Sequence, residues 1–339
     1  MSAPQQLRLL LPESLARAGW DVLKNRQDVE GILFDDEAPP ESLHPALRSA
    51  DGVALGHTHF GQAEIDAAQQ LRVVARIGVG YDSVDVAALT RRGIPLMMTD
   101  AENSVSVAEH TLAFMLALAK QIVGMNAMVH GGDWRERLTR GHIDLSGKTV
   151  LIIGFGRIGA RTASRCLAME MRVLVYDAML RSETIRAAGC EPASDMASGI
   201  ARADFVCILC PKTKETTNLF NAERLALMKS TAFLINTARG GMVDEAALYQ
   251  ALSSGKLAGA ALDVFDTEPL PLDSPLLKLP NFLTAPHVSG LTLEAAARMA
   301  EVTVRNILSV LDGHPNSESM LNREALRSAA PPALITGSQ

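Results

Sequence analysis

The fold of this chain is decided by the stretch Thr149-Val150-Leu151-Ile152-Ile153-Gly154-Phe155-Gly156-Arg157-Ile158-Gly159. Its run of branched and aliphatic residues is typical of a strand buried on both faces of a parallel sheet. Gly154 then makes a tight turn, Gly156 lets the backbone approach a pyrophosphate, and Gly159 lets helix and strand pack closely. The helical pattern that follows would point its N-terminus at the phosphates. The stretch therefore predicts a dinucleotide-binding turn.

A second strand and an acidic residue follow at the expected spacing. The apolar run Arg172–Tyr176 reads as a strand, and Asp177 comes 18 residues after Gly159. That spacing suits the carboxylate that binds the adenine ribose, so we interpret Asp177 as a cofactor ligand and not as a solvated turn residue. Because a carboxylate there would repel a 2′-phosphate, the sequence predicts NAD as cofactor and disfavours NADP.

Composition sets limits on partners and compartment. With 339 residues the chain is long enough for two domains, and 47% hydrophobic with 21% charged residues is ordinary for a globular enzyme. A formal net charge of −6 gives no general affinity for nucleic acid or an anionic membrane, so we expect neither as a partner. We see no signal-peptide pattern and no membrane-spanning run, and therefore expect a cytoplasmic protein.

The four cysteines are too few for a disulfide framework in a chain of this size. Cys207 and Cys210 have CxxC spacing, but they lie in an apolar run that reads as a strand. Because residues three apart in a strand point to opposite faces, we predict core thiols and no redox pair or metal site.

The order of apolar and polar segments predicts an α/β fold with two doubly wound parallel-sheet domains. We expect the second to be a Rossmann NAD-binding domain that opens with one long helix from residue 103 to about 129. A long amphipathic helix over 293–311 is expected to return the chain to a smaller, flavodoxin-like substrate-binding domain. The predicted boundaries are 1–102 with 292–325 for the substrate-binding domain, 103–291 for the NAD-binding domain, and 326–339 for a poorly ordered tail.

Three ionisable residues, Arg239, Glu268 and His287, each follow a predicted strand of the second sheet. Ligands of open α/β sheets bind outside these strand ends. Singly, each residue suits a solvated loop or a structural role, but three around one nucleotide site predict a functional cluster. Their chemistry fits hydride transfer to a 2-keto acid. A guanidinium stabilises charge on the keto oxygen, a histidine donates a proton, and a carboxylate favours the imidazolium.

Several motifs together resemble the D-2-hydroxyacid dehydrogenases, a family that includes phosphoglycerate, glyoxylate/hydroxypyruvate and D-lactate dehydrogenases. The resemblance covers residues 76–311. Besides the glycine stretch, it rests on Gly78-Val79-Gly80-Tyr81-Asp82-Ser83-Val84-Asp85, Asn103-Ser104-Val105-Ser106-Val107-Ala108-Glu109-His110, Asn236-Thr237-Ala238-Arg239-Gly240-Gly241, 263–269 and Pro286-His287.

The resemblance implies a role for each matching residue. Arg239 would bind the substrate, His287 would be the acid/base and Glu268 would tune it. Val79 and Gly80 would offer N–H groups to the substrate carboxylate, with Tyr81 near the substrate side chain. The implied cofactor contacts beyond the glycines and Asp177 are Arg157, Ile158, Cys210, Pro211, Thr237, Ala238, Asp263 (to the nicotinamide carboxamide) and Gly290. Family members are usually dimers joined through the nucleotide domain, so a homodimer is expected.

Two questions stay open from the sequence. An NAD-binding corepressor has the same architecture, and retention of Arg239, Glu268 and His287 argues against that alternative without removing it. The residues also do not separate glyoxylate, hydroxypyruvate, phosphohydroxypyruvate or a larger 2-keto acid as the substrate.

Overall fold

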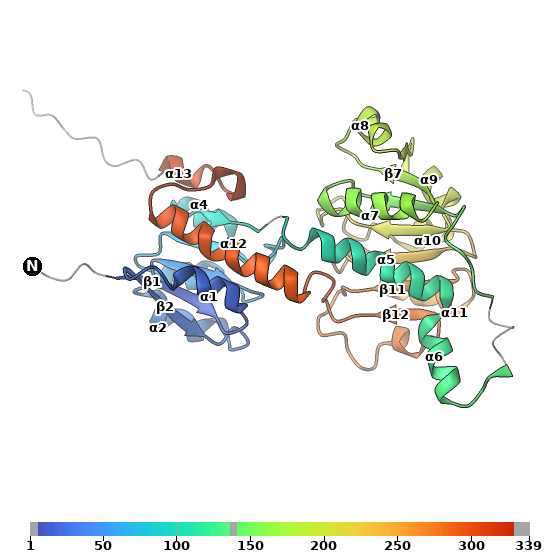
Figure 1. The fold of residues 1–339 in the computed structure, drawn as a ribbon, viewed down its shortest axis with the longest axis horizontal. Coiled ribbons are helices and arrows are strands. Elements are labelled where there is room, and N and C mark those ends of the chain that lie inside the picture. Colours follow the sequence, from blue (N-terminus) through green and yellow to red (C-terminus); the bar gives the residue numbers. More distant parts are fainter. Residues whose placement is uncertain (1–5, 100, 136–140, 329–339) are drawn as a thin grey trace, which may run out of the picture. The chain divides into compact units, whose positions relative to one another are not determined.

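A computed structural model describes residues 6–99, 101–135 and 141–328 (Figure 1). The chain divides into two compact units, one formed by Met1–Asn103 with Thr292–Gln339 and the other by Ser104–Leu291. Each unit has its own parallel sheet and its own hydrophobic core, which confirms the predicted fold class.

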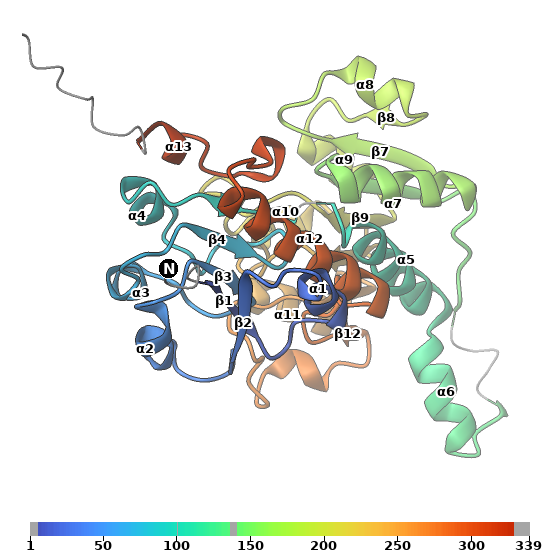
Figure 2. The ribbon, with the colours of Figure 1, turned by 60° about the vertical axis from the view of Figure 1, so that its left-hand side comes forward.

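The first unit contains a five-stranded parallel sheet in the order β2-β1-β3-β4-β5, the flavodoxin-like order. Its strands are β1 (Leu7–Pro12), β2 (Val29–Phe34), β3 (Gly52–Leu55), β4 (Val73–Arg76) and β5 (Leu96–Met97). Helices α1 (Arg17–Leu23) and α12 (Leu293–Leu311) cover one face, and α2 (His44–Leu47), α3 (Gln62–Ala67) and α4 (Val86–Arg91) cover the other (Figure 2). Strands β3 and β4 are buried along their whole length, as the apolar sequence runs require.

The C-terminal segment of the first unit pairs with the edge strand β5. The Met98 amide donates to the Ser319 carbonyl at 2.7 Å, and the Leu321 amide donates to the Leu96 carbonyl at 2.9 Å. The pairing is antiparallel, unlike the rest of the sheet. A short helix, α13 (Ala325–Ser328), takes up the first residues of the segment that we expected to be a tail; residues 329–339 lie outside the described part.

The second unit contains a seven-stranded parallel sheet in the order β12-β11-β10-β9-β6-β7-β8. Its strands are β6 (Thr149–Ile153), β7 (Arg172–Tyr176), β8 (Glu191–Pro192), β9 (Phe205–Ile208), β10 (Phe233–Asn236), β11 (Gly259–Leu262) and β12 (Phe282–Thr284). Helices α5 (Ser104–Lys120) and α7 (Arg157–Ala168) pack on one face, and α9 (Met196–Arg202), α10 (Ala222–Ala226) and α11 (Glu245–Ser253) on the other. From β6 the chain adds β7 and β8 on one side of the sheet and then crosses to add β9 to β12 on the other. Sheets of this Rossmann type bind their ligand at such a switch point, here between β6 and β9.

The long helix predicted from residue 103 to about 129 is two helices, α5 and α6 (Ile122–His130). Gln121 between them adopts a left-handed conformation with φ 49°, and the helix axes differ by 56°. Within the described residues, no single helix is long and apolar enough to cross a membrane; α5 and α6 pass that test only as a bent pair.

All four cysteines are free thiols, and the CxxC spacing does not bring two of them together as a disulfide. The Cys207 thiol is fully buried and donates to the Met115 sulfur at 3.8 Å. Burial raises the pKa of the Cys166 thiol to about 12. The prediction of a core thiol is confirmed for Cys207, whereas Cys210 is only partly buried; Cys166 and Cys190 are buried as well.

Candidate functional site

The glycine turn lies between β6 and α7, beside the loop that follows β9. Gly154 has φ 94°, and a Cβ placed on it would lie 2.7 Å from the backbone nitrogen of Cys210. A Cβ on Gly159 would lie 2.1 Å from the carbonyl oxygen of Gly154. Both positions therefore need glycine for the fold itself, because any side chain would push the turn away from the neighbouring backbone.

Gly156 differs from the other two glycines. It precedes the first residue of α7 with an ordinary extended backbone, and no atom lies within 4 Å of a Cβ placed there. The open space therefore lies at the N-terminus of a 12-residue helix, with Arg157 exposed and Ile158 partly buried in the first turn. Unpaired amides and the helix dipole favour a phosphate at such an end, so the turn fits a dinucleotide.

Asp177 follows β7 and connects the glycine turn to the next loop. One carboxylate oxygen, Oδ2, accepts the Phe155 amide at 2.8 Å. The other, Oδ1, accepts the amides of Met179 at 2.9 Å and Leu180 at 3.1 Å. A carboxylate offers about four lone-pair positions, so one is left for a ribose hydroxyl. Asp177 therefore fixes the backbone on both sides of the predicted adenosine position.

Asn236, which the sequence analysis did not single out, shapes the loop that carries Arg239. It ends β10 with 1% of its surface exposed. Its side-chain Nδ2 donates to the Arg239 carbonyl at 2.9 Å, and its Oδ1 accepts the Ala238 amide at 3.0 Å. A Cβ on Gly240 would lie 1.7 Å from the Phe265 carbonyl oxygen, so the Arg239 loop is pressed against the loop that leads to Glu268. The sequence did contain a signal for this role of Asn236, namely a polar residue at the end of an apolar strand.

Glu268 and His287, predicted from the sequence as the tuning group and the acid/base, lie in hydrogen-bond contact. The His287 Nδ1 lies 2.7 Å from Glu268 Oε2. Glu268 is itself held, since its Oε1 accepts the Phe265 amide at 2.9 Å. The two side chains are 33% and 37% exposed, so they are oriented by the protein and still reachable by a ligand. Such a carboxylate–imidazole contact fixes the orientation of the ring and leaves Nε2 as the nitrogen that can face a ligand.

Asp263 positions the segment that contains His287, a role the sequence analysis missed. The Asp263 side chain is fully buried, and its two oxygens accept the amides of Val288 at 2.9 Å and Ser289 at 2.8 Å. Its backbone carbonyl accepts the His287 amide at 2.8 Å. His287 has φ 52°, a left-handed conformation uncommon outside glycine, and these three bonds hold it there. Gly290 is buried in the same turn.

The remaining predicted cofactor residues line the same ends of the strands. Cys210 and Pro211 begin the loop after β9, and burial raises the pKa of the Cys210 thiol to about 11, so it is neutral at physiological pH. Thr237 is buried, and its hydroxyl lies 2.8 Å from that of Thr111 on α5. Within the part of the chain that the structure describes, no three His, Cys, Asp or Glu side chains are grouped to hold a metal ion.

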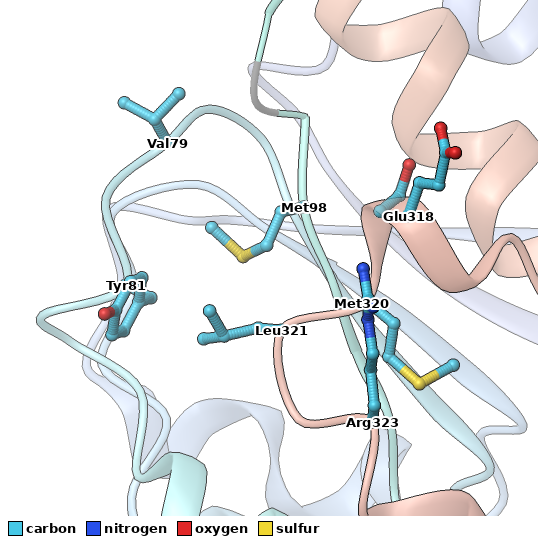
Figure 3. A pocket seen from close by; sticks show the side chains of 8 residues that line it. Val79, Tyr81, Met98, Glu318, Met320, Leu321 and Arg323 are labelled. Atoms are coloured by element: carbon cyan, nitrogen blue, oxygen red, sulfur yellow. The ribbon is translucent and has the colours of Figure 1, made fainter. Parts of the chain in front are cut away.

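The predicted substrate-carboxylate residues belong to the first unit, whereas Arg239, Glu268 and His287 belong to the second. Val79, Gly80 and Tyr81 form the loop after β4, and Tyr81 is 44% exposed. Val79 and Tyr81 line a hollow of about 290 Å³ together with Met98 and the C-terminal segment Glu318–Arg323 (Figure 3).

Comparisons with known proteins add independent evidence. Residues 112–289 match the family described as D-isomer specific 2-hydroxyacid dehydrogenase, NAD binding domain. A D-3-phosphoglycerate dehydrogenase of Archaeoglobus fulgidus is 41% identical over 91% of this chain and 58% of its own length. A glyoxylate reductase of Thermofilum pendens is 39% identical over 91% of this chain and 92% of its own length. The chain therefore spans little more than half of the first relative and nearly all of the second.

A solved structure gives the same result at the level of the fold. The D-lactate dehydrogenase of Aquifex aeolicus, crystallised with NAD and lactic acid, superposes with a TM-score of 0.81 and 28% identity. The match covers 93% of this chain and 98% of that protein. The similarity therefore extends through both units, beyond the nucleotide turn.

The three glycines of the turn predict two different mutant phenotypes. Gly156→Ala puts a methyl group into the open space at the start of α7, so the dissociation constant for NADH should rise at least about tenfold. Its free energy of unfolding should fall by no more than ~1 kcal/mol, the scale of a changed helix cap. Gly159→Ala meets the Gly154 carbonyl and should cost ~1–3 kcal/mol or more. NADH titration measures the dissociation constant, and denaturant unfolding of the cofactor-free proteins measures the free energy of unfolding. An equal loss of stability in Gly156→Ala and Gly159→Ala would contradict the prediction.

Asp177 should control the choice of cofactor. The parent protein should use NADH in preference to NADPH, because the carboxylate repels a 2′-phosphate. Asp177→Ser should lower the ratio of the two kcat/KM values by about tenfold or more, and NADH binding should also weaken, since the bond to Phe155 is lost. Initial rates with both cofactors provide the measurement. Equal efficiency of NADH and NADPH in the parent would refute the assignment.

Proposed function

The chain belongs to the D-isomer specific 2-hydroxyacid dehydrogenase family, and on that premise we propose that it interconverts a D-2-hydroxy acid and its 2-keto acid with NAD. The observation that carries the proposal is the 2.7 Å bond between His287 Nδ1 and Glu268 Oε2. It lies in the unit that contains the glycine turn and Asp177, and it provides an oriented proton donor for a ketone oxygen.

NADH, when bound, supplies the hydride that reduces the keto carbon. The bond to Glu268 occupies Nδ1 of His287, so proton exchange with the substrate is assigned to Nε2. His287 donates this proton to the keto oxygen during reduction and takes it back during oxidation. Glu268 is proposed to tune His287 by fixing the orientation of the ring through this bond.

Arg239 is proposed to bind the substrate carboxylate and keto oxygen through its planar guanidinium. The bonds of Asn236 and the close approach of Gly240 to Phe265 support this role, because they fix the loop on which Arg239 stands. The amides of Val79 and Gly80 are proposed to bind the carboxylate from the first unit. We propose a small-molecule 2-keto acid, or the matching 2-hydroxy acid, as the substrate.

A substrate panel with NADH tests the activity. Steady-state oxidation of NADH by glyoxylate, hydroxypyruvate, phosphohydroxypyruvate and larger 2-keto acids should show turnover with at least one acid. His287→Gln should lower kcat for that acid by ~10²–10⁴-fold, the scale of general-acid catalysis. Arg239→Lys loses the bidentate contact, so KM should rise and kcat fall.

The results of these assays distinguish an enzyme from a corepressor-like NAD-binding protein. Glu268→Gln should leave the NADH dissociation constant unchanged and lower kcat, because the ring loses its charged partner. Binding of NADH without turnover of any acid would favour a corepressor-like protein. A parent-like rate in His287→Gln would overturn the proton-donor assignment while leaving the NAD site intact.

We also propose a homodimer formed through the second unit. Helix α6 leaves Ile122, Val123 and Val129 between 52% and 59% exposed, and Trp134 just beyond it is 63% exposed. Clustered apolar side chains of this kind on one short segment support a protein–protein contact.

Val123→Asp should convert the dimer to a monomer, because a charge would be buried in the proposed contact. Light scattering coupled to size-exclusion chromatography measures the mass. Leu272→Asp is the matched control, since Leu272 is 93% exposed in the same unit and lies outside α6. A parent protein that elutes as a monomer, or a dimer in both variants, would contradict the proposed contact.

A cytoplasmic location is proposed on chemical grounds. Free thiols and the use of NAD suit a reducing compartment, and a net charge of −6 provides no attraction to nucleic acid or to an anionic membrane. Cell fractionation with activity measured in each fraction tests this location; activity confined to the membrane fraction would oppose it.

A further inference from the structure

The loop Gly78–Tyr81 has to keep two amides in fixed directions although much of it is open to solvent. Val79 and Gly80 are partly exposed and Tyr81 is exposed. The loop begins at Gly78, whose φ of 109° is a conformation that side-chain-bearing residues rarely adopt. A mobile loop would lose much of its binding energy in becoming ordered around a carboxylate, so something beneath it has to fix the backbone.

Thr99, two residues after the end of β5, binds the backbone beneath this loop. Its hydroxyl accepts the Gly78 amide at 2.6 Å and lies 3.3 Å from the Arg76 carbonyl, to which it donates. The side chain is 1% exposed, so the bonds are shielded from water. One hydroxyl thus binds the backbone on both sides of Ile77, immediately before the two amides of the loop.

The position of Thr99 is itself fixed by its neighbour Met98. The Met98 amide donates to Ser319 at 2.7 Å, and the Met98 carbonyl accepts the side-chain amide of Asn306 on α12 at 3.0 Å. Asn306 is 5% exposed. Figure 3 shows Met98 between the Val79–Tyr81 loop and the C-terminal segment. Thr99 therefore follows a residue whose backbone is bound both to the C-terminal segment and to α12.

Another buried threonine in the same unit shows that burial alone does not explain these bonds. Thr303 on α12 is fully buried, and within the described part of the chain its hydroxyl has no hydrogen-bond partner. A valine would fill either space equally well. Of these two threonines, Thr99 is the one whose hydroxyl makes contacts that an isosteric methyl group cannot make.

We propose that Thr99 is a positioning residue for the substrate carboxylate. Its hydroxyl fixes the peptide of Gly78 so that the amides of Val79 and Gly80 are preorganised for binding the acid. This inference rests on the proposed function, in which those amides hold the carboxylate. Because the carboxylate is bound in the ground state and in the transition state alike, loss of the hydroxyl should act mainly on KM.

The experiment compares Thr99→Val, Thr99→Ser and the matched control Thr303→Val in steady-state reduction of the best acid of the panel. Thr99→Val should raise KM for the acid about tenfold, the scale of a lost contact to a charged group, with kcat changed less than about threefold. Thr99→Ser keeps the hydroxyl and should restore a KM close to that of the parent. Thr303→Val should match the parent in KM and kcat.

The NADH dissociation constant and a replacement variant test whether the change in KM comes from the Thr99 hydroxyl. The NADH dissociation constant should be the same in all variants, because NADH is held in the second unit. If Thr99→Val does not fold, Thr99→Ala replaces it, and KM should still rise in the Ala variant and not in the Ser variant. An unchanged KM in the folded Val or Ala variant, or an equal rise in the Ser variant, overturns the role of Thr99. Absence of turnover in the parent overturns instead the proposed function.

Discussion

The end of the second sheet that carries His287 depends on a buried carboxylate. Asp263 accepts the amides of Val288 and Ser289 through its side chain and that of His287 through its carbonyl, so three consecutive residues are bound by one. Burying a charged carboxylate is costly unless its oxygens are well hydrogen-bonded, and here the compensating amides belong to the turn that carries His287. The uncommon backbone of His287 is a result of this arrangement, and the Glu268 pair then orients the ring.

The sequence predicted the elements that follow from local rules. The apolar run and the three glycines predicted β6, the turn and α7 with their correct neighbours, since each glycine has a distinct steric reason. The break between α5 and α6 was missed because the helical pattern passes through Gln121 without a glycine or proline. Gln121 is not a residue type that signals a left-handed backbone, so the linear pattern gave no sign of the break.

The candidate site shows the same division. The contact between Glu268 and His287 could be predicted because each is an ionisable residue in a loop that follows a strand. The role of Arg239 stays a prediction. The groups that hold them could not. Asn236 and Asp263 act through backbone amides, and the Thr99 hydroxyl reaches an amide 21 residues away. Which amide a buried polar side chain will meet depends on the register of neighbouring strands, which the sequence does not state.

The discontinuity of the first unit has a consequence for biosynthesis. The second unit is continuous over Ser104–Leu291, so all of its strands have left the ribosome before the chain is finished. The core of the first unit needs Ala300, Val304 and Ile307 from α12, and β5 needs its partner at Ser319–Leu321. The N-terminal strands of the first unit are therefore synthesised before the second unit, but their core is completed only after it. One apolar face of their sheet lacks α12 throughout synthesis of the second unit. An apolar face exposed during synthesis is prone to aggregation until α12 covers it.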